Sequence, residues 1–415
     1  MPNPATTSSN GPLSANPIRG PRNLSVEDAR ARMLARAAAL PAETIGVVEA
    51  DGRVLAETIT AIRDQPPFDA SAMDGWAVKR ADVGHAVSLT IAGESAAGRG
   101  YEPVLQAGEA VRIFTGAPVP AGADLVVIQE NAERDGDHVR LGPAGDGGSN
   151  VRPRGGDFRA GAVLLEPGVR LDPWRLSLAA AAGRAEVKVA RRPRVAVLAT
   201  GEELAAPGGE AGPFQIYESG GAGLLPMIRR WGGLPTRLAP AGDTLEAIVA
   251  AVRDIDAEVI VTVGGASVGD YDLVKPALAT LGLELDIETI NVRPGKPTWF
   301  GRLGDSRLVL GLPGNPASAF VCAELFLKPL VLALQGAEQP HRMDTAPLAV
   351  ALPANGPREH WMRARLGPDG VTPFPDQDSS LVTVFAAADA LLRRLPGAPA
   401  AVAGATMDIL RLDRA

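Results

Sequence analysis

Glycines, a serine, two aspartates and a lysine follow one strongly apolar segment, and together they could bind a phosphate and a metal ion. Residues 259–263 read Val-Ile-Val-Thr-Val, and the chain continues as Gly-Gly-Ala-Ser-Val-Gly-Asp-Tyr-Asp-Leu-Val-Lys. Glycines let backbone N–H groups approach an anion closely, and the start of a following helix adds partial positive charge. Asp270, Asp272 and Lys275 would place carboxylates and an ammonium group beside that anion. This combination suits a metal-bridged phosphate.

Three other polar turns border apolar segments and could contribute to the same site. Residues 200–203 read Thr-Gly-Glu-Glu, residues 292–297 read Val-Arg-Pro-Gly-Lys-Pro, and residues 312–316 read Leu-Pro-Gly-Asn-Pro. The first offers carboxylates to a metal, and the second sets two cations around a rigid turn where both could reach one anion. Each turn also has a purely structural explanation, as a helix cap, a solvated turn or a helix start, so spacing alone leaves both explanations open.

Two aspartates outside that region lie beside glycines. Asp74 belongs to residues 66–77, Pro-Pro-Phe-Asp-Ala-Ser-Ala-Met-Asp-Gly-Trp-Ala, and we expect this stretch to be a loop that exposes the carboxylate. Asp157 follows two glycines, Gly155 and Gly156. On spacing alone, both aspartates are equally well explained as parts of surface turns.

The pentapeptide Gly-Ala-Ser-Val-Gly at residues 265–269 matches the nucleophile elbow of serine hydrolases. That chemistry needs a histidine base after Ser267, and the downstream histidines, His341 and His360, lie beyond the expected end of the sheet. We therefore favour the alternative, in which the Ser267 hydroxyl donates a hydrogen bond to a bound anion, and keep the hydrolase as a less favoured rival.

Composition limits the class of protein. The chain has 415 residues, of which 46% are hydrophobic, and this length predicts about two to four domains. A net charge of −7 gives no electrostatic footprint for nucleic acid or an anionic membrane. No apolar run approaches the roughly 18 residues that a membrane span requires, and the first residues lack the apolar core of a secretion signal. Cys322 is the single cysteine. We expect a cytoplasmic protein that binds neither nucleic acid nor membrane, and the spacing of its four histidines disfavours zinc.

The distribution of apolar segments predicts several domains. From residue 193, apolar strands that end in glycine alternate with helical segments, which is typical of a doubly wound parallel sheet with ligands at the carboxyl ends of its strands. A capped helix is expected from Ser25, and short strands at regular intervals are expected between residues 63 and 154. The expected division is a disordered tail (1–21), a linker domain in two segments (22–62 and 155–192), an inserted β-rich domain (63–154), an α/β domain (193–338) and a C-terminal β domain (339–415).

Seven motifs occur in one order along the chain: PPFDASAMDGWAV, FTGAPVPAGAD, NVRPRGGD, TGEEL, GGASVGDYDLVK, RPGKP and GLPGNPASA. Together they resemble the MoeA-type molybdopterin molybdenumtransferase family, which includes the gephyrin E domain. The resemblance extends from about residue 24 to the C-terminus. It implies a multidomain α/β fold with a doubly wound molybdopterin-binding sheet domain, an elongated linker domain, an inserted β domain and a C-terminal β barrel.

The resemblance also implies an activity. Such an enzyme takes adenylylated molybdopterin and molybdate, cleaves the phosphate anhydride with release of AMP, and leaves molybdenum on the dithiolene, with Mg²⁺ as the expected cofactor. It further implies a homodimer in which Asp74 reaches the site of the partner subunit, and a contact with the molybdopterin adenylyltransferase. A non-catalytic molybdopterin carrier or scaffold is the alternative from another class.

Individual residues match the functional positions of that family. The resemblance implies five functional acids, which are Asp74, Asp157, Glu203, Asp243 and Asp272. Of these, Glu203, Asp243 and Asp272 would be the metal ligands. It implies substrate-binding residues at Thr200, Gly201, Gly264, Gly265, Ser267, Gly269, Lys275, Arg293, Lys296, Pro313, Gly314, Asn315, Arg363 and Ser379.

Four places in the sequence depart from the family pattern. Arg293 stands where lysine is common, which keeps the charge but changes a point donor into a planar fork. Gly156 removes one acid beside Asp157, and Gly220 with Gly221 replaces an asparagine-containing sequence that we expect to be a loop. The register around Ser379 is also altered, because Gln377-Asp378-Ser379 replaces a Gln-Gly-Ser pattern.

Overall fold

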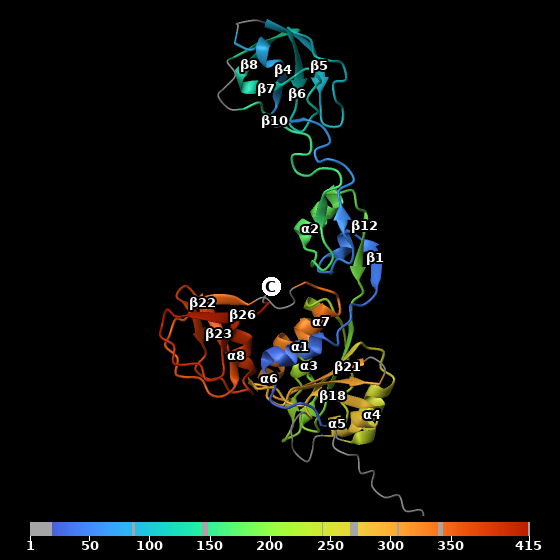
Figure 1. The fold of residues 1–415 in the computed structure, drawn as a ribbon, viewed down its shortest axis with the longest axis vertical. Coiled ribbons are helices and arrows are strands. Elements are labelled where there is room, and N and C mark those ends of the chain that lie inside the picture. Colours follow the sequence, from blue (N-terminus) through green and yellow to red (C-terminus); the bar gives the residue numbers. More distant parts are fainter. Residues whose placement is uncertain are drawn as a thin grey trace, which may run out of the picture.

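The computed structural model describes residues 19–84, 88–142, 148–242, 244–265, 273–304, 307–338 and 343–413. The molecule is elongated: a small β-rich unit lies at one end, a narrow two-segment linker follows, and an α/β unit with an attached β barrel lies at the other end (Figure 1). This arrangement is the multidomain α/β architecture that the sequence predicts.

A six-stranded sheet forms the centre of the α/β unit, in the order β16-β13-β17-β21-β20-β18. Four of its strands are parallel: β13 (Arg194–Ala199), β16 (Leu234–Arg237), β17 (Val259–Val263) and β21 (Arg307–Leu312). The other two, β20 (Trp299–Leu303) and β18 (Leu283–Ile287), lie at one edge, where β20 runs antiparallel to both β21 and β18. The expectation of a parallel sheet is therefore right for the strands that carry the glycine turns and wrong for this edge, where a hairpin extends the sheet.

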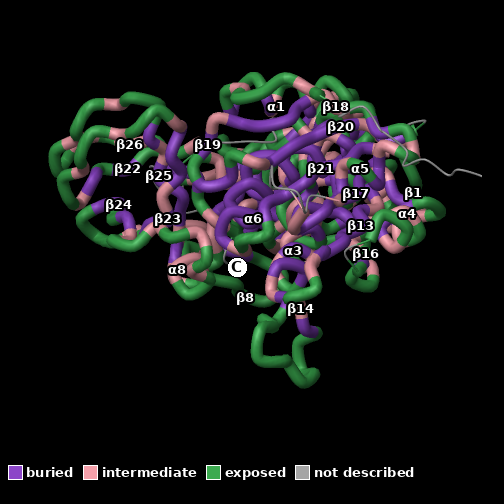
Figure 2. The backbone as a smooth tube through the Cα atoms, turned by 90° about the horizontal axis from the view of Figure 1, so that it is seen from below, coloured by how far each residue is buried: buried purple, intermediate pink, exposed green. Residues whose placement is uncertain are grey.

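Helices cover both faces of this sheet, which makes it doubly wound. One face carries α1 (Val26–Leu34), α3 (Gly220–Arg230), α6 (Pro316–Cys322) and α7 (Lys328–Ala333), with a π-helical turn, Ala323–Leu327, between the last two. The other face carries α4 (Leu245–Arg253) and α5 (Val274–Ala279). The central strands β13, β17 and β21 are buried between these layers (Figure 2). Ser25 caps α1 as predicted, because its side chain accepts a hydrogen bond from the backbone N–H of Asp28.

Three sequence expectations need correction in this unit. Residues 316–333 form one helical stretch long and apolar enough to cross a membrane, contrary to our reading of the apolar runs, but 83% of it is buried inside the protein as a core helix. Gly20 and Pro21, assigned to the tail, bond to Glu288 of the α/β unit. Gly220 and Gly221 are not a loop but the first turn of α3, where the Glu218 carboxylate accepts a 2.5 Å hydrogen bond from Gly221 N–H.

The linker unit is built from two distant segments of the chain. β1 (Ala42–Gly46) pairs with β12 (Glu186–Ala190), and β2 (Ile59–Thr60) pairs with β11 (Val163–Leu165). Helix α2 (Pro173–Ala181) packs on these strands around a separate small core. The antiparallel pairs hold the two segments side by side, so the unit between them is carried as an insertion.

The inserted unit is a six-stranded sheet in the order β7-β4-β6-β5-β9-β8. Its strands are β4 (Gly75–Val78), β5 (Ser88–Ser95), β6 (Glu109–Ile113), β7 (Leu125–Ile128), β8 (Ala132–Asp135) and β9 (His138–Leu141), and β3 (Ala70–Ser71) pairs with β10 (Val151–Arg152) at its base. Residues 75–77 were expected to be a loop, which is wrong. All four residues of β4 are buried, so the strand lacks the alternation of a half-buried strand. Gly75 fits there because a Cβ would collide with the carbonyl oxygen of Val127.

The C-terminal unit is the expected β barrel. Its strands are β22 (Asp344–Pro347), β23 (Glu359–Gly367), β24 (Gly370–Pro373), β25 (Ala390–Arg394) and β26 (Thr406–Arg411), with a short helix α8 (Val382–Ala387). The bridge between Leu348 and Val371 closes the circle from β22 to β24. The short strand β19 (Val292–Arg293), which comes from the α/β unit, pairs in parallel with β23. This pairing joins the two units at the place where a cavity opens.

Candidate active site

A cavity of 670 Å³ lies at the junction of the α/β unit and the barrel. Three segments from distant parts of the sequence line it: the turn that follows β19, the start of α6, and strand β23 with the loop before α8. The lining residues are Arg293, Pro294, Gly295, Lys296, Pro297, Pro313, Asn315, Ser318, Arg358, His360, Met362, Pro375, Asp376, Gln377, Asp378 and Ser379. The structure thus brings five predicted substrate-binding residues to one cavity: Arg293, Lys296, Pro313, Asn315 and Ser379.

The cavity has a basic wall. Arg293, the last residue of β19, and Lys296, on the turn that follows, are exposed, and Arg358 joins them from the position directly before β23. Two carboxylates, Asp376 and Asp378, lie on the loop side. Asp378 is engaged within its own turn, because hydrogen bonds from the Ser380 side chain and backbone hold its pKa below the usual range. Cations, hydroxyls and an amide around one cavity are donors that suit an oxoanion.

Arg363 is fully buried beside this cavity. Its Nε donates to Gln377 Oε1 at 3.1 Å, and its Nη1 donates to the backbone oxygen of Asp378 at 2.9 Å. Nη2 is enclosed and has no hydrogen-bond partner among the described residues. Burial lowers the pKa of the guanidinium, which still remains a cation at any ordinary pH. Arg363 therefore fixes the loop that carries Ser379 and keeps one donor unused.

His360 adds an uncharged imidazole to the same wall. It is 7% exposed, and its Nε2 has no hydrogen-bond partner in the described part of the chain. Burial, together with the charges of Arg293 and Arg363, lowers its pKa to about 4. At neutral pH the ring is therefore neutral, in the middle of a group of cations.

The glycine turns predicted at the strand ends meet next to this cavity. Thr200 is buried directly after β13, and its Oγ1 has no partner among the residues that the structure describes. Gly264 follows β17 with φ +95°, and a Cβ there would lie 2.6 Å from the carbonyl oxygen of Thr200. Gly314, after β21, is so close that its Cβ would lie 3.5 Å from the Cα of Gly264. Because Pro313 and Asn315 line the cavity and flank Gly314, the glycine turns lie directly beside the cavity.

Two further predicted glycines belong to the same turns. Gly201 has φ +139° and Gly265 has φ +58°, both in the range that favours glycine. A side chain on Gly265 would collide with Val274 at the start of α5. Lys275 follows in α5, where it is half-buried. Bare backbone at three adjacent strand ends is a surface on which a phosphate can lie closely.

Three of the five predicted acids lie among the described residues. Glu203 is exposed, and its carboxylate folds back over Gly201 at the carboxyl end of β13. Asp74 lies directly before β4 of the inserted unit, and Asp157 lies between β10 and β11. Figure 1 shows β4 and β10 at the other end of the molecule from the α/β unit and the barrel, between which the cavity lies. Asp74 accepts hydrogen bonds from Thr115 N and Oγ1 at 2.7 and 2.8 Å, which hold its pKa below the usual range.

Four predicted site residues lie outside the described residues: Asp243, Ser267, Gly269 and Asp272. Asp243 and Asp272 are two of the three expected metal ligands, and Ser267 is the serine of the hydrolase alternative. Among the described residues, no group of three or more histidine, cysteine, aspartate or glutamate side chains is placed to hold a metal ion.

Sequence reasoning missed part of the cavity wall, notably Arg358, His360, Ser318 and Gln377. A signal existed for two of them. Residues 358, 360 and 362 alternate along β23, and alternate residues of a strand point to one face. What the sequence does not reveal is that this strand pairs with β19 of another unit.

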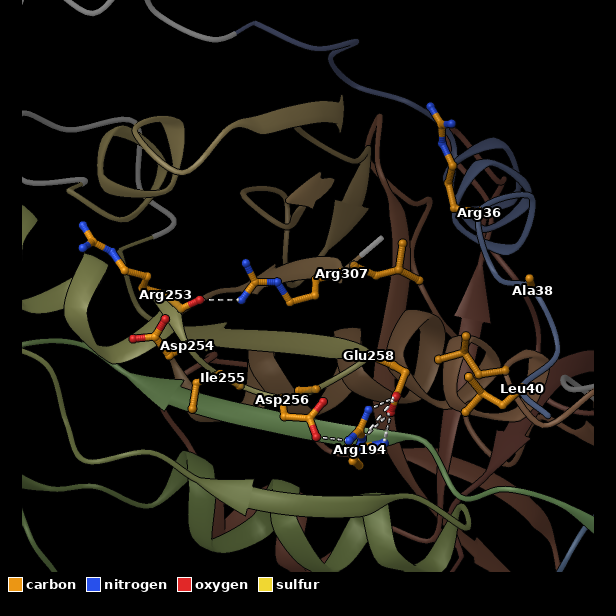
Figure 3. A pocket seen from close by; sticks show the side chains of 13 residues that line it. Arg36, Ala38, Leu40, Arg194, Arg253, Asp254, Ile255, Asp256, Glu258 and Arg307 are labelled. Carbon is orange, nitrogen blue, oxygen red and sulfur yellow. Dashed lines mark hydrogen bonds and ion pairs between the residues drawn. The ribbon is translucent and has the colours of Figure 1, made fainter. Parts of the chain in front are cut away.

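A second cavity, of 590 Å³, lies at the opposite ends of the sheet strands (Figure 3). Its charged groups bond mainly to the protein itself. Arg194 forms ion pairs with Asp256 and Glu258, and Arg307 Nη1 donates to the carbonyl oxygens of Val252 and Arg253 at the end of α4. These contacts have a structural purpose, which is to hold the amino-terminal edge of the sheet together.

Comparison with known protein families assigns all four units. Residues 24–183 match the model of the MoeA N-terminal region (domain I and II), and residues 196–333 match that of a probable molybdopterin binding domain. Residues 345–412 match the MoeA C-terminal region (domain IV). Together the three models account for most of the chain.

Curated relatives and solved structures agree with this assignment. A molybdopterin molybdenumtransferase of Bacillus subtilis is 33% identical over 89% of each chain, and molybdopterin molybdenumtransferase 2 of Mycobacterium tuberculosis is 38% identical over 78% of this chain and 83% of its own. A crystal structure of a MoeA molybdopterin biosynthesis protein from a Pyrococcus species has a TM-score of 0.79 at 30% identity and covers 94% of this chain and 99% of its own. The chain therefore belongs to the family of MoeA-type molybdopterin molybdenumtransferases, which are enzymes of molybdenum cofactor biosynthesis.

Proposed function

We propose that this enzyme transfers molybdenum from molybdate to adenylylated molybdopterin with release of AMP. The observation that carries the proposal is the basic cavity between sheet and barrel, which lies directly beside the glycine turns. The glycine turns offer close backbone approach to a phosphate, and the cavity offers cations and hydroxyls to a second, tetrahedral anion. Two adjacent anion sites are what a reaction between a pyrophosphate and molybdate requires.

The residues of the cavity have distinct tasks in this proposal. Arg293 and Lys296 attract and hold the dianion, while the Asn315 amide and the Ser379 hydroxyl orient its oxygens. Arg363 holds the loop that carries Ser379 in place through the backbone oxygen of Asp378, and its buried positive charge lies beside the same cavity. Charge that develops as the anhydride is cleaved then meets donors that are already fixed in position.

The proposed chemistry is balanced without an oxidant or reductant. An oxygen nucleophile, which molybdate itself can supply, bonds to phosphorus while the bridging P–O bond breaks and AMP departs. Where molybdate is the nucleophile, water then cleaves the resulting P–O–Mo bond and returns molybdate. Molybdate then exchanges one oxo oxygen for the two dithiolene sulfurs. That oxygen leaves as water with the two thiol protons, and molybdenum keeps its oxidation state.

The described residues fit the Mg²⁺ that the family implies. The unpartnered Thr200 Oγ1 and the glycine turns leave room for a phosphate, and the Glu203 carboxylate lies over the same turns. Glu203 would hold the ion together with Asp243 and Asp272, because Mg²⁺ prefers carboxylate and phosphate oxygens. When bound, Mg²⁺ would neutralise negative charge on the pyrophosphate.

The proposal includes a homodimer. Asp74 is an ionised carboxylate of the inserted unit, which lies at the other end of the elongated molecule from the α/β unit and the barrel (Figure 1). It can therefore act in catalysis only if a second subunit brings it to the cavity. We further propose that the enzyme works in the cytoplasm and receives its substrate directly from the molybdopterin adenylyltransferase, which would protect a labile intermediate.

The decisive experiment measures AMP release from adenylylated molybdopterin by the purified protein with Mg²⁺, with and without molybdate. We expect molybdate to stimulate release. The variant Lys296→Met should bind the adenylylated substrate but lose the stimulation, whereas Lys188→Met, on β12 of the linker, should behave as wild type. Tight substrate binding without any AMP release would instead support a carrier or scaffold. Labelling of Ser267 by a fluorophosphonate would support the hydrolase.

A further inference from the structure

His360 lies where three strands from two units come together. It is in β23, its register neighbour in β19 is Arg293, and its register neighbour in β25 is Arg394. It lines the basic cavity together with Arg293 and Lys296, and it is more than nine-tenths buried. The ring is therefore held in one place by the strands around it and is in contact with the interior of the cavity.

The Nε2 atom of this ring is enclosed without a hydrogen-bond partner in the described residues. A buried polar atom left unsatisfied costs about 1–3 kcal/mol, so such an atom indicates a bond that is made only in another state of the protein. Arg363 Nη2, on the same strand, is unsatisfied in the same way. His360 lines the cavity and Arg363 does not, so the nitrogen that a ligand in the cavity can complete is Nε2 of His360.

The charges around the ring come from every element that packs against it. Arg293 approaches from β19 and Arg394 from β25. Arg363 belongs to β23 itself, and Arg358 directly precedes that strand. Lys296, Asp376 and Asp378 occupy the other walls of the cavity. The nearest groups are thus guanidinium cations, which oppose a further positive charge on the ring.

We infer that His360 is an oxoanion-binding residue of the basic cavity, and that its imidazole takes up a proton when molybdate enters. This inference rests on the proposed function, since it assigns the cavity to the molybdate dianion. A dianion among the guanidinium groups offsets much of the local positive charge, so the ring can accept a proton and donate hydrogen bonds from both nitrogens. Molybdate affinity then becomes linked to pH, which a permanently charged lysine or arginine could not achieve.

The direction of the linkage follows from the state of the ring. Without a ligand, burial and the neighbouring arginines hold the pKa of His360 at about 4, so the ring is neutral near pH 7. With the dianion bound, its pKa rises, and the complex holds more protons than the empty protein. Binding must therefore tighten as the pH falls through the pKa of the bound state toward that of the free protein, by up to about tenfold per pH unit.

Titration calorimetry of the full chain with molybdate alone tests this without any turnover. Measured at one pH in two buffers of different ionisation enthalpy, binding should take up a fraction of a proton, and Kd should fall by at least about threefold between about pH 8 and about pH 6. The variant His360→Gln keeps a hydrogen-bonding group but cannot titrate, so both effects should vanish. His138→Gln, at an exposed histidine of the inserted unit, is the matched control and should retain them.

The remaining outcomes decide the inference. Equal proton uptake in wild type and His360→Gln would overturn the inference. So would a lack of proton uptake in wild type, and this second test holds even if the variant does not fold. A phosphate monoester competes for the same chemistry, and AMP at about pH 8 is a dianion. Binding of AMP without binding of molybdate would overturn the assignment to the oxoanion. Proton-linked molybdate binding in a protein that never releases AMP would support the role of His360 in oxoanion binding and reject the proposed reaction.

Discussion

Asn315 and Ser379 form a hydrogen bond across two units of the protein, with Asn315 Nδ2 donating to Ser379 Oγ at 2.9 Å. Asn315 occupies the N-cap position of α6, yet its side chain does not cap the helix. The backbone oxygen of Ser379 accepts from Ala317 N–H at 3.2 Å instead. The loop of the barrel thus performs the capping, and the asparagine amide is directed to the cavity wall.

This arrangement predicts that Ser379→Ala weakens oxoanion binding more than it weakens folding. The substitution removes one hydrogen bond of about 0.5–1.5 kcal/mol but keeps the backbone contact to Ala317. We expect the Kd for molybdate to rise by about three- to tenfold, measured by calorimetry. Ser380→Ala is the control, because its hydroxyl bonds only to Asp378 within the turn among the contacts that the structure describes. Equal losses in both variants would contradict a specific role for Ser379.

A second prediction concerns the charge of Arg363. Because this guanidinium is fully buried with one nitrogen unsatisfied, Arg363→Met should change the free energy of unfolding by no more than about 2 kcal/mol. Molybdate affinity should nevertheless fall by at least about tenfold. Urea unfolding and calorimetry measure the two quantities. Arg365→Met, on the same strand but exposed and stacked on Phe374, should leave affinity unchanged. A large loss of stability with intact affinity would make Arg363 purely structural.

A third prediction separates close approach from backbone conformation at the strand ends. Gly264 and Gly282 have similar positive φ angles, +95° and +84°, but only Gly264 faces other atoms. Gly282→Ala should cost about 1–2 kcal/mol from backbone strain alone. Gly264→Ala should cost more, because its Cβ would lie 2.6 Å from the carbonyl oxygen of Thr200. Thermal unfolding tests the difference, and equal costs would show that the packing at this turn is loose.

The second cavity gives a prediction about acid stability. Burial of Glu258 tends to raise its pKa, but hydrogen bonds from Arg194 and Arg191 outweigh this and lower it to about 2 (Figure 3). A depressed carboxylate pKa stabilises the folded state above the unfolded value and loses that contribution as the pH falls. Glu258→Gln should therefore cost about 1–2 kcal/mol at pH 7, after allowance for solvent screening.

The same comparison repeated at lower pH gives the sign of the effect. The difference in unfolding free energy between wild type and Glu258→Gln should shrink as the pH falls from about 4.5 toward about 2, as measured by urea unfolding at several pH values. Asp254→Asn, an exposed acid of the same cavity, serves as control and should have little effect at any pH. A difference that does not depend on pH would mean that Glu258 acts through packing and not through its charge.

Much of the fold could be predicted because its signals are local. A strand that ends in glycine and is followed by a helical segment is visible in the sequence, and the parallel strands β13, β17 and β21 were expected for this reason. Strand β4 was missed because four consecutive buried residues show no alternation and are too few to be recognised by length. The start of α3 was missed because two glycines usually break helices, and here a buried Glu218 carboxylate compensates at the helix start.

The candidate site could be predicted only where one segment carried several functional residue types. The turn at residues 293–297 has two cations within four positions and was identified. Arg358 and His360 were not, because their proximity to that turn depends on the pairing of β19 with β23 across a unit boundary. Such pairing is set by tertiary packing, and nothing in the local pattern of either segment specifies it.

The last prediction tests whether the active site is shared between subunits. If Asp74 acts on the cavity of its partner, then a heterodimer of Asp74→Asn and Arg363→Met subunits contains one cavity with both residues intact. Each variant alone should lose at least about tenfold in AMP release, and the mixed dimer should recover about half of the wild-type rate.

A matched negative control comes from two residues on the same cavity. Subunits carrying Lys296→Met and Arg363→Met should not complement each other, because each cavity of their heterodimer lacks one of the two cations. Recovery in the first mixture and not in the second would place Asp74 and the cavity on different subunits. If neither mixture recovers although both form dimers, Asp74 does not act across the interface, and the distance between it and the cavity within one chain would then exclude it from the chemistry (Figure 1).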